Sequence, residues 1–366
     1  MAGLDDQPGQ GDARRAAPAR APDGGAAPRR RGAAEAADDA QGARGRAGCA
    51  GGARSVQRPV GGGPSAAAGA DARHAPGSAD LPGWDDDDLA AALGAYGRSA
   101  ALTGMPLPPE GAGPDWFRTA FWTAPATAAF LTGYYEPELP GAVTRSDAFP
   151  VPLLALPPGF TPGPGAPDRA TILTGIYDRH ALCWLADPLE AFLAQVQGSV
   201  RVRLADGRVL RLGYAGKNGH PYRSIGQELV ARGAVGPDRI DVQAIRDWAA
   251  AHPEALDGLL AVNPSYVFFR LLDLPPEAGP LGALGVSLTP MRSIAVDPDH
   301  VPLGSPVWIE APGMAPRLVI AQDIGGAIKG PGRGDLYIGS GVQAGRTAGA
   351  IRATGRMWVL HPRGQG

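Results

Sequence analysis

Two carboxylates on either side of a glycine-rich loop are the residues of this sequence best placed to do chemistry. Asp323 ends the apolar run of residues 317–322, and Asp335 precedes the short apolar run of residues 336–338. Glycines beside an acid let the backbone turn sharply and let a ligand come close. A third carboxylate, Asp297, ends another apolar run upstream. The three acids are therefore predicted to stand at strand ends beside an open loop.

Cleavage of a polysaccharide is the reaction that these acids suit. One carboxylic acid protonates the leaving oxygen, so it must hold its proton near neutral pH. A second carboxylate nearby is one way to raise its pKa. We expect Asp335 to move the proton, with Lys329 of the same loop as a substrate contact. The alternative is that the aspartates cap turns by accepting hydrogen bonds from backbone amides, and spacing alone does not decide between the two.

Other function classes lack their motifs. The sequence has no G-x-S-x-G elbow, no Walker loop and no H-E-x-x-H zinc pattern. Its six histidines form no metal pattern, and its two cysteines, Cys49 and Cys183, are too few for a disulfide framework. The formal net charge of -2 gives no general attraction to nucleic acid. We therefore expect no metal site and no nucleic-acid partner.

Two adjacent tyrosines lie upstream in a β-prone run. Tyr134 and Tyr135 end the run FLTGYY, which stops at Pro137. They point to opposite faces of a strand, so one can enter the core while the other faces a cleft. A tyrosine face offers apolar area with a polar tip, which suits a sugar ring. Glu136 is a further candidate acid, and the alternative is a surface carboxylate at the strand end.

Residues 1–79 are predicted to be a disordered arm. They are rich in Ala, Gly, Arg, Pro and Asp and nearly lack large apolar side chains, so burial cannot offset the entropy of ordering them. The arm has no apolar run of the kind an export signal needs, and no stretch of the chain suits a membrane span. Small residues before Cys49 resemble a lipoprotein site, but Arg46 argues against lipidation.

The folded part is predicted to begin near Leu81 and to contain a separate unit over residues 147–282. A polar, glycine-rich loop at residues 213–226 is expected to face a ligand, and the alternative is a plain surface loop. Other elements follow from caps, periodicity and turn residues. They are helices over residues 89–102, 114–122, 188–197 (capped by Asp187), 224–232 and 241–251, a hairpin over residues 200–214 and a strand over residues 266–270.

Short strands dominate the sequence after residue 282. Six runs of apolar residues between turns, with no helix of length, predict a small closed barrel. The runs are ALGVSLTP, SIAVD, SPVWIEAP, RLVIAQD, DLYIGS and RMWVL.

Several motifs, in the same order, resemble the membrane-bound lytic murein transglycosylase A family. They are LTGYYEP, GYAGKNGHPYRSIG, NPSY, LTPMRSIAVDPDHVPLGSPVWI, AQDIGGAIKG and GDLYIG, from about Leu131 to the C-terminus. The resemblance implies a mainly β fold. A double-psi β-barrel is formed by residues 80–147 and 283–366, a β-rich domain of residues 148–282 is inserted, and the glycan lies in the groove between them.

The same resemblance implies cleavage of the β-1,4 bond between N-acetylmuramic acid and N-acetylglucosamine in peptidoglycan. The muramic acid C6 hydroxyl attacks C1 and leaves a 1,6-anhydro ring. Asp335 matches the family's single general acid and base, and Asp323 would orient it. Substrate contacts are expected from residues on both sides of the groove. They are Tyr134, Tyr135, Glu136, Asp297, Lys329, Tyr222, Arg223 and Ser224.

The family uses no metal or cofactor, and its partner is the peptidoglycan glycan strand. We expect a monomer, able to join cell-wall enzyme complexes, in the periplasm and associated with the outer membrane. That location is inferred from the substrate, because the present N-terminus departs from the family in showing no export signal. Two alternatives remain, a glycan hydrolase that admits water and a non-catalytic polysaccharide-binding module.

Overall fold

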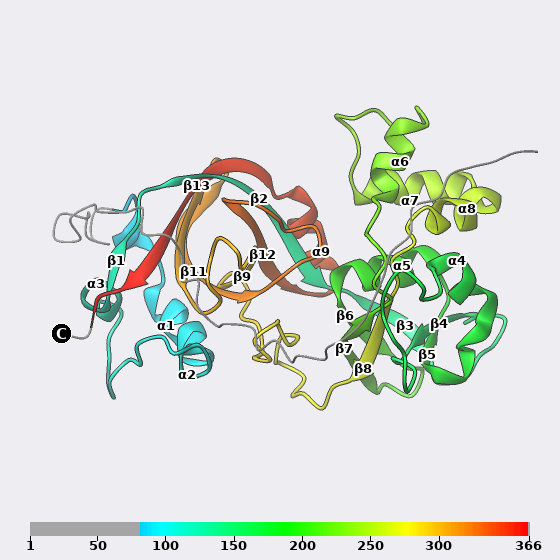
Figure 1. Ribbon diagram of the computed structural model, residues 1–366, viewed down its shortest axis with the longest axis horizontal. Coiled ribbons are helices and arrows are strands. Elements are labelled where there is room, and N and C mark those ends of the chain that lie inside the picture. Colours follow the sequence, from blue (N-terminus) through cyan, green and yellow to red (C-terminus); the bar gives the residue numbers. More distant parts are fainter. Residues whose placement is uncertain (1–80, 365–366) are drawn as a thin grey trace, which may run out of the picture. The chain divides into compact units, whose positions relative to one another are not determined.

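The computed structural model describes residues 81–364. Two β-sheets organise this part of the chain, one of seven strands and one of six (Figure 1). The expectation of a mainly β chain, with a barrel and a second β-rich unit, is confirmed. The predicted disordered arm, residues 1–79, and Cys49 within it lie outside the described residues.

Six strands of the larger sheet close into a barrel. They are β2 (Thr127–Glu136), β9 (Ser293–Val296), β10 (Pro306–Ala311), β11 (Met314–Asp323), β12 (Arg333–Ser340) and β13 (Arg352–Pro362). Their order is β13-β10-β11-β9-β12-β2, and β2 pairs back with β13. The pairs β9–β11 and β2–β12 are parallel, whereas the other four are antiparallel. A short strand, β1 (Phe121–Thr123), extends the sheet beside β13.

Apolar side chains from every barrel strand meet in one buried cluster. Because all six strands contribute to it, the cluster fills the barrel interior. Its buried members are Ala129, Leu131, Ile294, Val296, Val301, Val307, Ile309, Ala311, Val319, Ala321, Leu336 and Met357. Residues that alternate with these along each strand therefore face outward, and this alternation decides where the acids point.

The strands expected after residue 282 need two corrections. The first run, ALGVSLTP, forms no strand and makes only a single bridge, between Leu281 and Ser287, so the sixth barrel strand is β2. The last part of the chain also contains a helix, α9 (Gly341–Ala350), that the prediction missed. Three glycines in ten residues weakened its sequence signal, because glycine is a poor helix former.

The second sheet is an open one, in the order β4-β5-β3-β6-β7-β8. Its strands are β3 (Glu138–Ala142), β4 (Val151–Leu154), β5 (Ala181–Leu185), β6 (Ser199–Arg203), β7 (Val209–Lys217) and β8 (Val267–Leu271). The predicted hairpin is confirmed as β6 and β7, and the strand predicted at residues 266–270 is confirmed as β8. One buried cluster, which includes Leu153, Val200 and Phe269, lies against this sheet.

Helices accompany the second sheet where the sequence predicted them. Asp187 caps α5 (Pro188–Gln197) by accepting from Leu189 N at 2.7 Å. The predictions for α6 (Ile225–Ala231) and α7 (Val242–Ala251) are also confirmed. Shorter helical elements complete this part. They are α4 (Arg169–Thr171), η3 (Ile172–Ile176), η4 (Asp178–His180), η5 (Pro253–Ala255) and α8 (Leu256–Ala261).

The chain changes sheet at Pro137. Strand β2 ends at Glu136 in the barrel, and β3 begins at Glu138 in the second sheet, where it pairs with β5 and β6. The chain returns to the barrel between β8 and β9. The boundary expected at residues 147–148 therefore falls within the second sheet.

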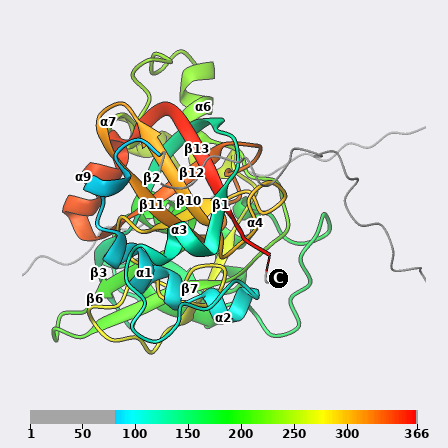
Figure 2. The ribbon, with the colours of Figure 1, turned by 90° about the vertical axis from the view of Figure 1, so that its left-hand side faces the viewer.

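Helices at the start of the described chain cover one side of the barrel (Figure 2). Asp88 caps α1 (Leu89–Gly97) by accepting from Ala91 N at 3.0 Å. The helix predicted over residues 89–102 is interrupted before α2 (Ala100–Thr103). The remaining elements here are η2 (Trp84–Asp86) and α3 (Trp116–Ala120).

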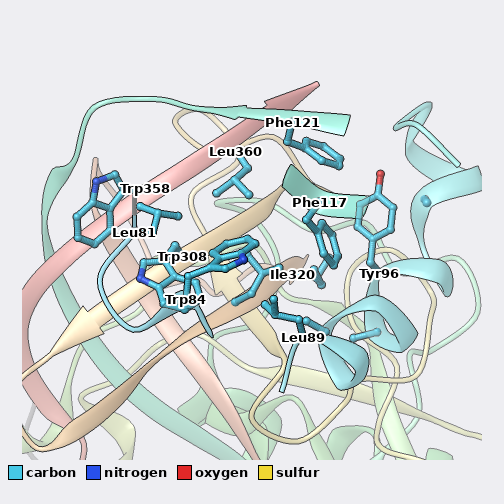
Figure 3. Packing of buried hydrophobic residues seen from close by; sticks show 14 residues of the cluster. Leu81, Trp84, Leu89, Tyr96, Phe117, Phe121, Trp308, Ile320, Trp358 and Leu360 are labelled. Atoms are coloured by element: carbon cyan, nitrogen blue, oxygen red, sulfur yellow. The ribbon is translucent and has the colours of Figure 1, made fainter. Parts of the chain in front are cut away.

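An aromatic cluster joins these helices to the outside of the barrel (Figure 3). Tyr96 packs edge-on against Phe117 and Phe121, with ring centroids 5.5 and 5.8 Å apart. Trp84 packs on Trp308 of β10 at 5.1 Å. All five side chains are at most 1% exposed, so the aromatic residues around α3 are part of the core.

Removing one ring from this cluster should destabilise the fold. For Phe121→Ala we expect the free energy of unfolding to fall by ~3–5 kcal/mol, because a fully buried ring leaves a cavity among rigid neighbours. Urea denaturation would measure it, with the exposed Leu107→Ala as control. Equal stability of the two variants would contradict the assigned packing.

Candidate active site

The pairing of three strands brings two of the predicted acids together. Asp323 on β11 and Asp335 on β12 lie opposite the same residue, Ala295, on the strand between them. Two interstrand steps separate their backbones by ~10 Å. Partners in register project to the same face of a sheet, so the two carboxylates share one side of β9.

Alternation along β12 turns Asp335 out of the barrel. Its neighbour Leu336 is part of the interior cluster. On the other side, a Cβ on Gly334 would lie 2.8 Å from Ile294 Cδ1, so this position also faces inward and admits only glycine without movement of a neighbour. Asp335 lies between two inward positions and therefore points outward.

A β-bulge directs Asp323 to the same side. The register of β11 against β9 shifts between Ala321 and Asp323, which leaves Gln322 as the extra residue. The side chain of Gln322 is buried, where it donates to Ser99 Oγ at 2.8 Å and accepts from Ser293 Oγ at 2.7 Å. These bonds hold the bulge that aims Asp323.

Asp335 is held by one of its two oxygens. Thr132 Oγ1, on the neighbouring β2, donates to Oδ1 at 2.5 Å, and Arg333 Nη2 donates to Thr132 Oγ1 at 2.8 Å. Oδ2 accepts no hydrogen bond from residues 81–364 and is not among their buried unpaired atoms, so it is open to solvent. Burial raises the pKa of Asp335, while the Thr132 hydrogen bond and the Arg333 charge oppose the rise.

Asp323 is held by both of its oxygens. Tyr134 Oη donates to Oδ2 at 2.7 Å, and the backbone amides of Ala283 and Ile324 donate to Oδ1 at 3.0 and 2.9 Å. Burial raises the pKa of Asp323 to about 6, although all three donors favour the carboxylate. The nearby charge of Asp335 adds to this rise in the pKa of Asp323.

Asp297 fixes the loop between the other two acids. Its Oδ2 accepts from Gly330 N at 2.8 Å, and its Oδ1 accepts from Lys329 Nζ at 3.2 Å. The Gly330 amide and then the Lys329 charge lower the pKa of Asp297, so it is ionised at neutral pH. Lys329 remains 61% exposed. Among residues 81–364, no three His, Cys, Asp or Glu side chains are grouped as metal ligands would be.

The two adjacent tyrosines take different roles. Tyr134 lies beside the acids, bonded to Asp323, and its ring packs on Tyr337 with centroids 5.4 Å apart. Tyr135 instead packs on α9, where a Cβ on Gly345 would lie 2.8 Å from its ring. The structure therefore places Tyr134, rather than Tyr135, next to the candidate chemistry.

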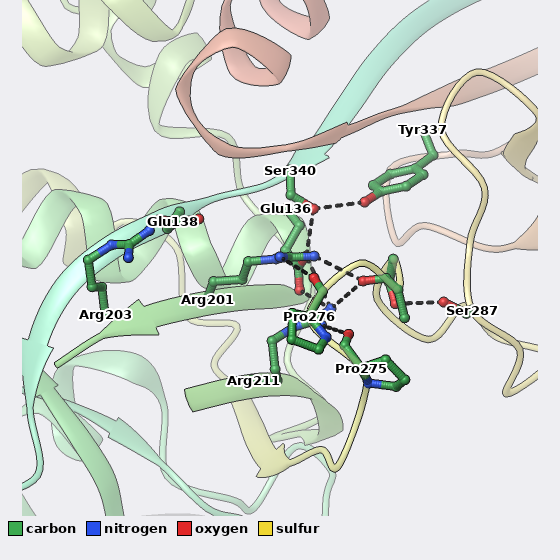
Figure 4. A network of polar contacts seen from close by, with 12 residues as sticks. Glu136, Glu138, Arg201, Arg203, Arg211, Pro275, Pro276, Ser287, Tyr337 and Ser340 are labelled. Carbon is green, nitrogen blue, oxygen red and sulfur yellow. Dashed lines mark hydrogen bonds and ion pairs between the residues drawn. The ribbon is translucent and has the colours of Figure 1, made fainter. Parts of the chain in front are cut away.

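Glu136 lies at the centre of a buried ion-pair network between the two sheets (Figure 4). Its Oε2 accepts from Arg201 Nε at 2.7 Å, and its Oε1 accepts from Arg211 Nη2 at 3.2 Å. Glu136 is only 1% exposed, so the alternative of a surface carboxylate is wrong. Both oxygens are engaged, and the geometry gives Glu136 a role in joining the sheets in place of the expected substrate contact.

The same network reaches toward the acids. Ser340 Oγ donates to Glu136 Oε2 at 2.7 Å and lies 3.1 Å from Tyr337 Oη. The ring of Tyr337 packs in turn on Tyr134, which binds Asp323. A continuous set of contacts thus connects Asp323 to the ion pairs between the sheets.

Tyr222, Arg223 and Ser224 lie apart from these contacts, in the wall of a cavity of about 680 Å³. Ser224 also caps α6 by accepting from Gln227 N at 3.2 Å. Ala327, from the loop between Asp323 and Asp335, lines the same cavity. The predicted loop of the second sheet and the acid loop of the barrel therefore border one hollow.

Sequence reasoning missed the residues that support the acids. Thr132 and Arg333 were not singled out, although each stands two positions from a predicted site residue, Tyr134 or Asp335, and so shares its strand face. Arg201 and Arg211 gave no comparable signal. Their alternation in the hairpin was visible, but their partner Glu136 lies more than sixty residues away.

Comparisons with known proteins agree with this architecture. The family model described as the MltA specific insert domain matches residues 130–270, and the 3D domain model matches residues 292–361. A crystal structure of a membrane-bound lytic murein transglycosylase from Agrobacterium tumefaciens is 31% identical, with a TM-score of 0.69 over 79% of this chain and 97% of that one. The chain belongs to the membrane-bound lytic murein transglycosylase A family.

Two further relatives are from Escherichia coli. Membrane-bound lytic murein transglycosylase A of strain K12 is 39% identical over 243 residues, which is 63% of this chain and 65% of that protein, so the match spans just under two-thirds of the relative. The structure of E. coli MltA with bound chitohexaose is 30% identical, with a TM-score of 0.64 over 77% of this chain and 91% of that one. The predicted family is confirmed. Between residues 81 and 364, no helix is both long and apolar enough to cross a bilayer.

Removing Glu136 should destabilise this member of the family strongly. Glu136→Ala leaves Arg211, only 6% exposed, and Arg201 without their carboxylate, so we expect a loss of ~3–5 kcal/mol in the free energy of unfolding. The matched control is Glu138→Ala, whose partner Arg203 is exposed and whose loss should cost under ~1 kcal/mol. Comparable losses in thermal or urea denaturation would contradict the buried network.

The raised pKa of Asp323 should make stability depend on pH. Because folding favours the protonated carboxyl, the stability that it contributes is present below about pH 4 and is lost as the pH rises through about 6. An asparagine side chain does not titrate, so it adds no pH dependence to the stability. Asp323→Asn should therefore gain ~1–3 kcal/mol on the wild type between about pH 4 and pH 8. A difference in melting temperature that does not change with pH would rule out a raised pKa.

Proposed function

We propose that this chain is a lytic transglycosylase, which cleaves the β-1,4 bond between N-acetylmuramic acid and N-acetylglucosamine in peptidoglycan. Membership of the family supports the reaction class. The observation that carries the assignment of the acid is the environment of Asp335, a partly buried carboxyl with a raised pKa, one oxygen fixed by Thr132 and the other open. An acid of this kind keeps its proton and can present it to a ligand.

In the proposed reaction Asp335 acts first as an acid and then as a base. It gives its proton to the glycosidic oxygen as the bond from that oxygen to C1 of the muramic acid breaks. The C6 hydroxyl oxygen of the same sugar bonds to C1, and its proton passes to the Asp335 carboxylate. The acid is regenerated, a 1,6-anhydro ring forms, and no water is consumed.

Asp323 assists through its charge. With a pKa of about 6 it is mostly ionised at neutral pH, and its three donors hold the carboxylate in place. A fixed negative charge disfavours ionisation of Asp335 and stabilises the positive charge that develops at C1. Both effects favour protonation of the leaving oxygen by Asp335.

The proposed substrate is the glycan strand of peptidoglycan. A related E. coli structure holds chitohexaose, which supports binding of an oligosaccharide here. We place the glycan along the open side of the acids. Lys329 of the acid loop is exposed, and Tyr222, Arg223 and Ser224 line the adjoining cavity. A cell-wall substrate, together with relatives named as membrane-bound, supports a periplasmic location at the outer membrane.

The decisive test is mass analysis of what the purified chain releases from isolated sacculi. The wild type should release anhydro-muropeptides, which are one water lighter than hydrolysis products. Asp335→Asn should lower the rate by ~10²–10⁴-fold, because general acid and base catalysis is lost while the shape is kept. The exposed Asp257→Asn is the matched control and should retain full activity.

Other outcomes would point to other functions. Reducing muropeptides without the anhydro ring would indicate a hydrolase that admits water. Binding to sacculi with no released fragments would indicate a binding module. Full activity of Asp335→Asn would mean that a different residue is the acid.

A further inference from the structure

Arg333 is connected to the proposed acid, Asp335, through a hydrogen bond to Thr132. It lies two positions before Asp335 on the same strand, and its Nη2 donates to Thr132 Oγ1 at 2.8 Å. Its Nη1 donates to the carbonyls of Gly334 and Phe130 at 2.5 and 3.3 Å, and its guanidinium lies 5.2 Å from the centre of the Phe130 ring. These contacts hold the guanidinium in one orientation.

The contact with Thr132 settles the direction of the next hydrogen bond. An arginine N–H can only donate, so Thr132 Oγ1 is the acceptor in the bond with Arg333. The threonine hydroxyl has one hydrogen of its own, and Asp335 Oδ1 lies 2.5 Å from it. Thr132 therefore donates to Oδ1, and Oδ1 is an acceptor whether Asp335 is protonated or not.

We propose that Arg333 is a positioning residue, which acts through Thr132 to keep the proton of Asp335 on Oδ2, the oxygen open to the glycan. The role rests on the proposed function of Asp335 as the acid. Without the arginine, the hydroxyl of Thr132 could turn and accept the proton of Asp335 at Oδ1. The proton would then point at the protein and not at the leaving oxygen.

Arg333 is one of several charged groups that surround the carboxyl of Asp335. Its charge opposes the burial that raises the pKa of Asp335. The nearby group of the same sign as Asp335 is the Asp323 carboxyl of β11, which is bonded to Tyr134 of β2. Other charged or titratable groups stand on the elements packed against β12 and β2. Among them are Asp297 with Lys329, Tyr337, Arg346 of α9, Arg352, which pairs opposite Thr132, and Glu136, which is paired with Arg201 and Arg211.

A purely structural role for Arg333 is the competing explanation. The arginine also binds two backbone carbonyls beside the acid, so its removal could simply loosen the end of the strand. Stability would then fall, but the titration of Asp335 and the pH dependence of the reaction would stay where they are. The test must therefore measure the titration of the Asp335 carboxyl as well as the rate of the reaction.

The experiment compares Arg333→Gln with Arg333→Lys, and Thr132→Val with Thr132→Ser. For each, kcat and KM for release of anhydro-muropeptides are measured across the pH range. The titration of the Asp335 carboxyl is followed by carbon-13 NMR, with Asp335→Asn to identify its signal. Arg333→Gln should shift both the NMR midpoint and the basic limb of activity upward by ~1 pH unit. It should lower kcat more than it changes KM.

The conservative variants provide the controls. Arg333→Lys keeps a charge and a donor, and Thr132→Ser keeps the hydroxyl, so both should stay near the wild-type midpoint, whereas Thr132→Val should shift upward. An unchanged midpoint in Arg333→Gln would overturn the proposal, and so would equal behaviour of Thr132→Val and Thr132→Ser. The threonine pair decides the question if Arg333→Gln does not fold. The NMR titration needs no turnover, so a wild type that releases no anhydro product would refute the function separately.

Discussion

The register of β9 between β11 and β12 is the constraint on which the candidate site depends. It sets Asp323 and Asp335, twelve residues apart in the chain, opposite the same alanine. A slip of one residue would turn either acid into the barrel, because side chains alternate along a strand. Two features prevent the slip, the inward Gly334, which has no room for a side chain, and the bulge fixed by buried Gln322. Barrel packing thus determines the geometry of the acids.

Strand β2 extends this constraint to the rest of the chain. Thr132, Tyr134 and Glu136 alternate with other residues and so share one strand face. The first binds Asp335, the second binds Asp323, and the third binds the arginines of the second sheet. One strand face therefore supports both acids and also joins the two sheets.

Local signals in the sequence predicted the elements that depend on local chemistry. The helix capped by Asp187, the hairpin around Asp206-Gly207 and the acids at strand ends all follow from neighbouring residues. The motifs also pointed to the family. The partners of Glu136 could not be predicted, because ion pairs across sixty or more residues leave no local pattern. The sequence did not predict the glycine-rich α9, because this helix is stabilised by packing on β2 and β12 and not by helix propensity.

Asp323 and Asp335 lie in the same part of the structure but differ in the hydrogen bonds that their carboxyl groups accept. Burial raises the pKa of both, so burial alone cannot assign their roles. The donors differ. Asp323 accepts three hydrogen bonds that engage both oxygens, and such bonds favour the ionised form and fix the carboxylate in place. Asp335 accepts one, at Oδ1, and keeps Oδ2 free. An acid that must give and then retrieve a proton needs that free oxygen, whereas an acid that acts by its charge needs to be held.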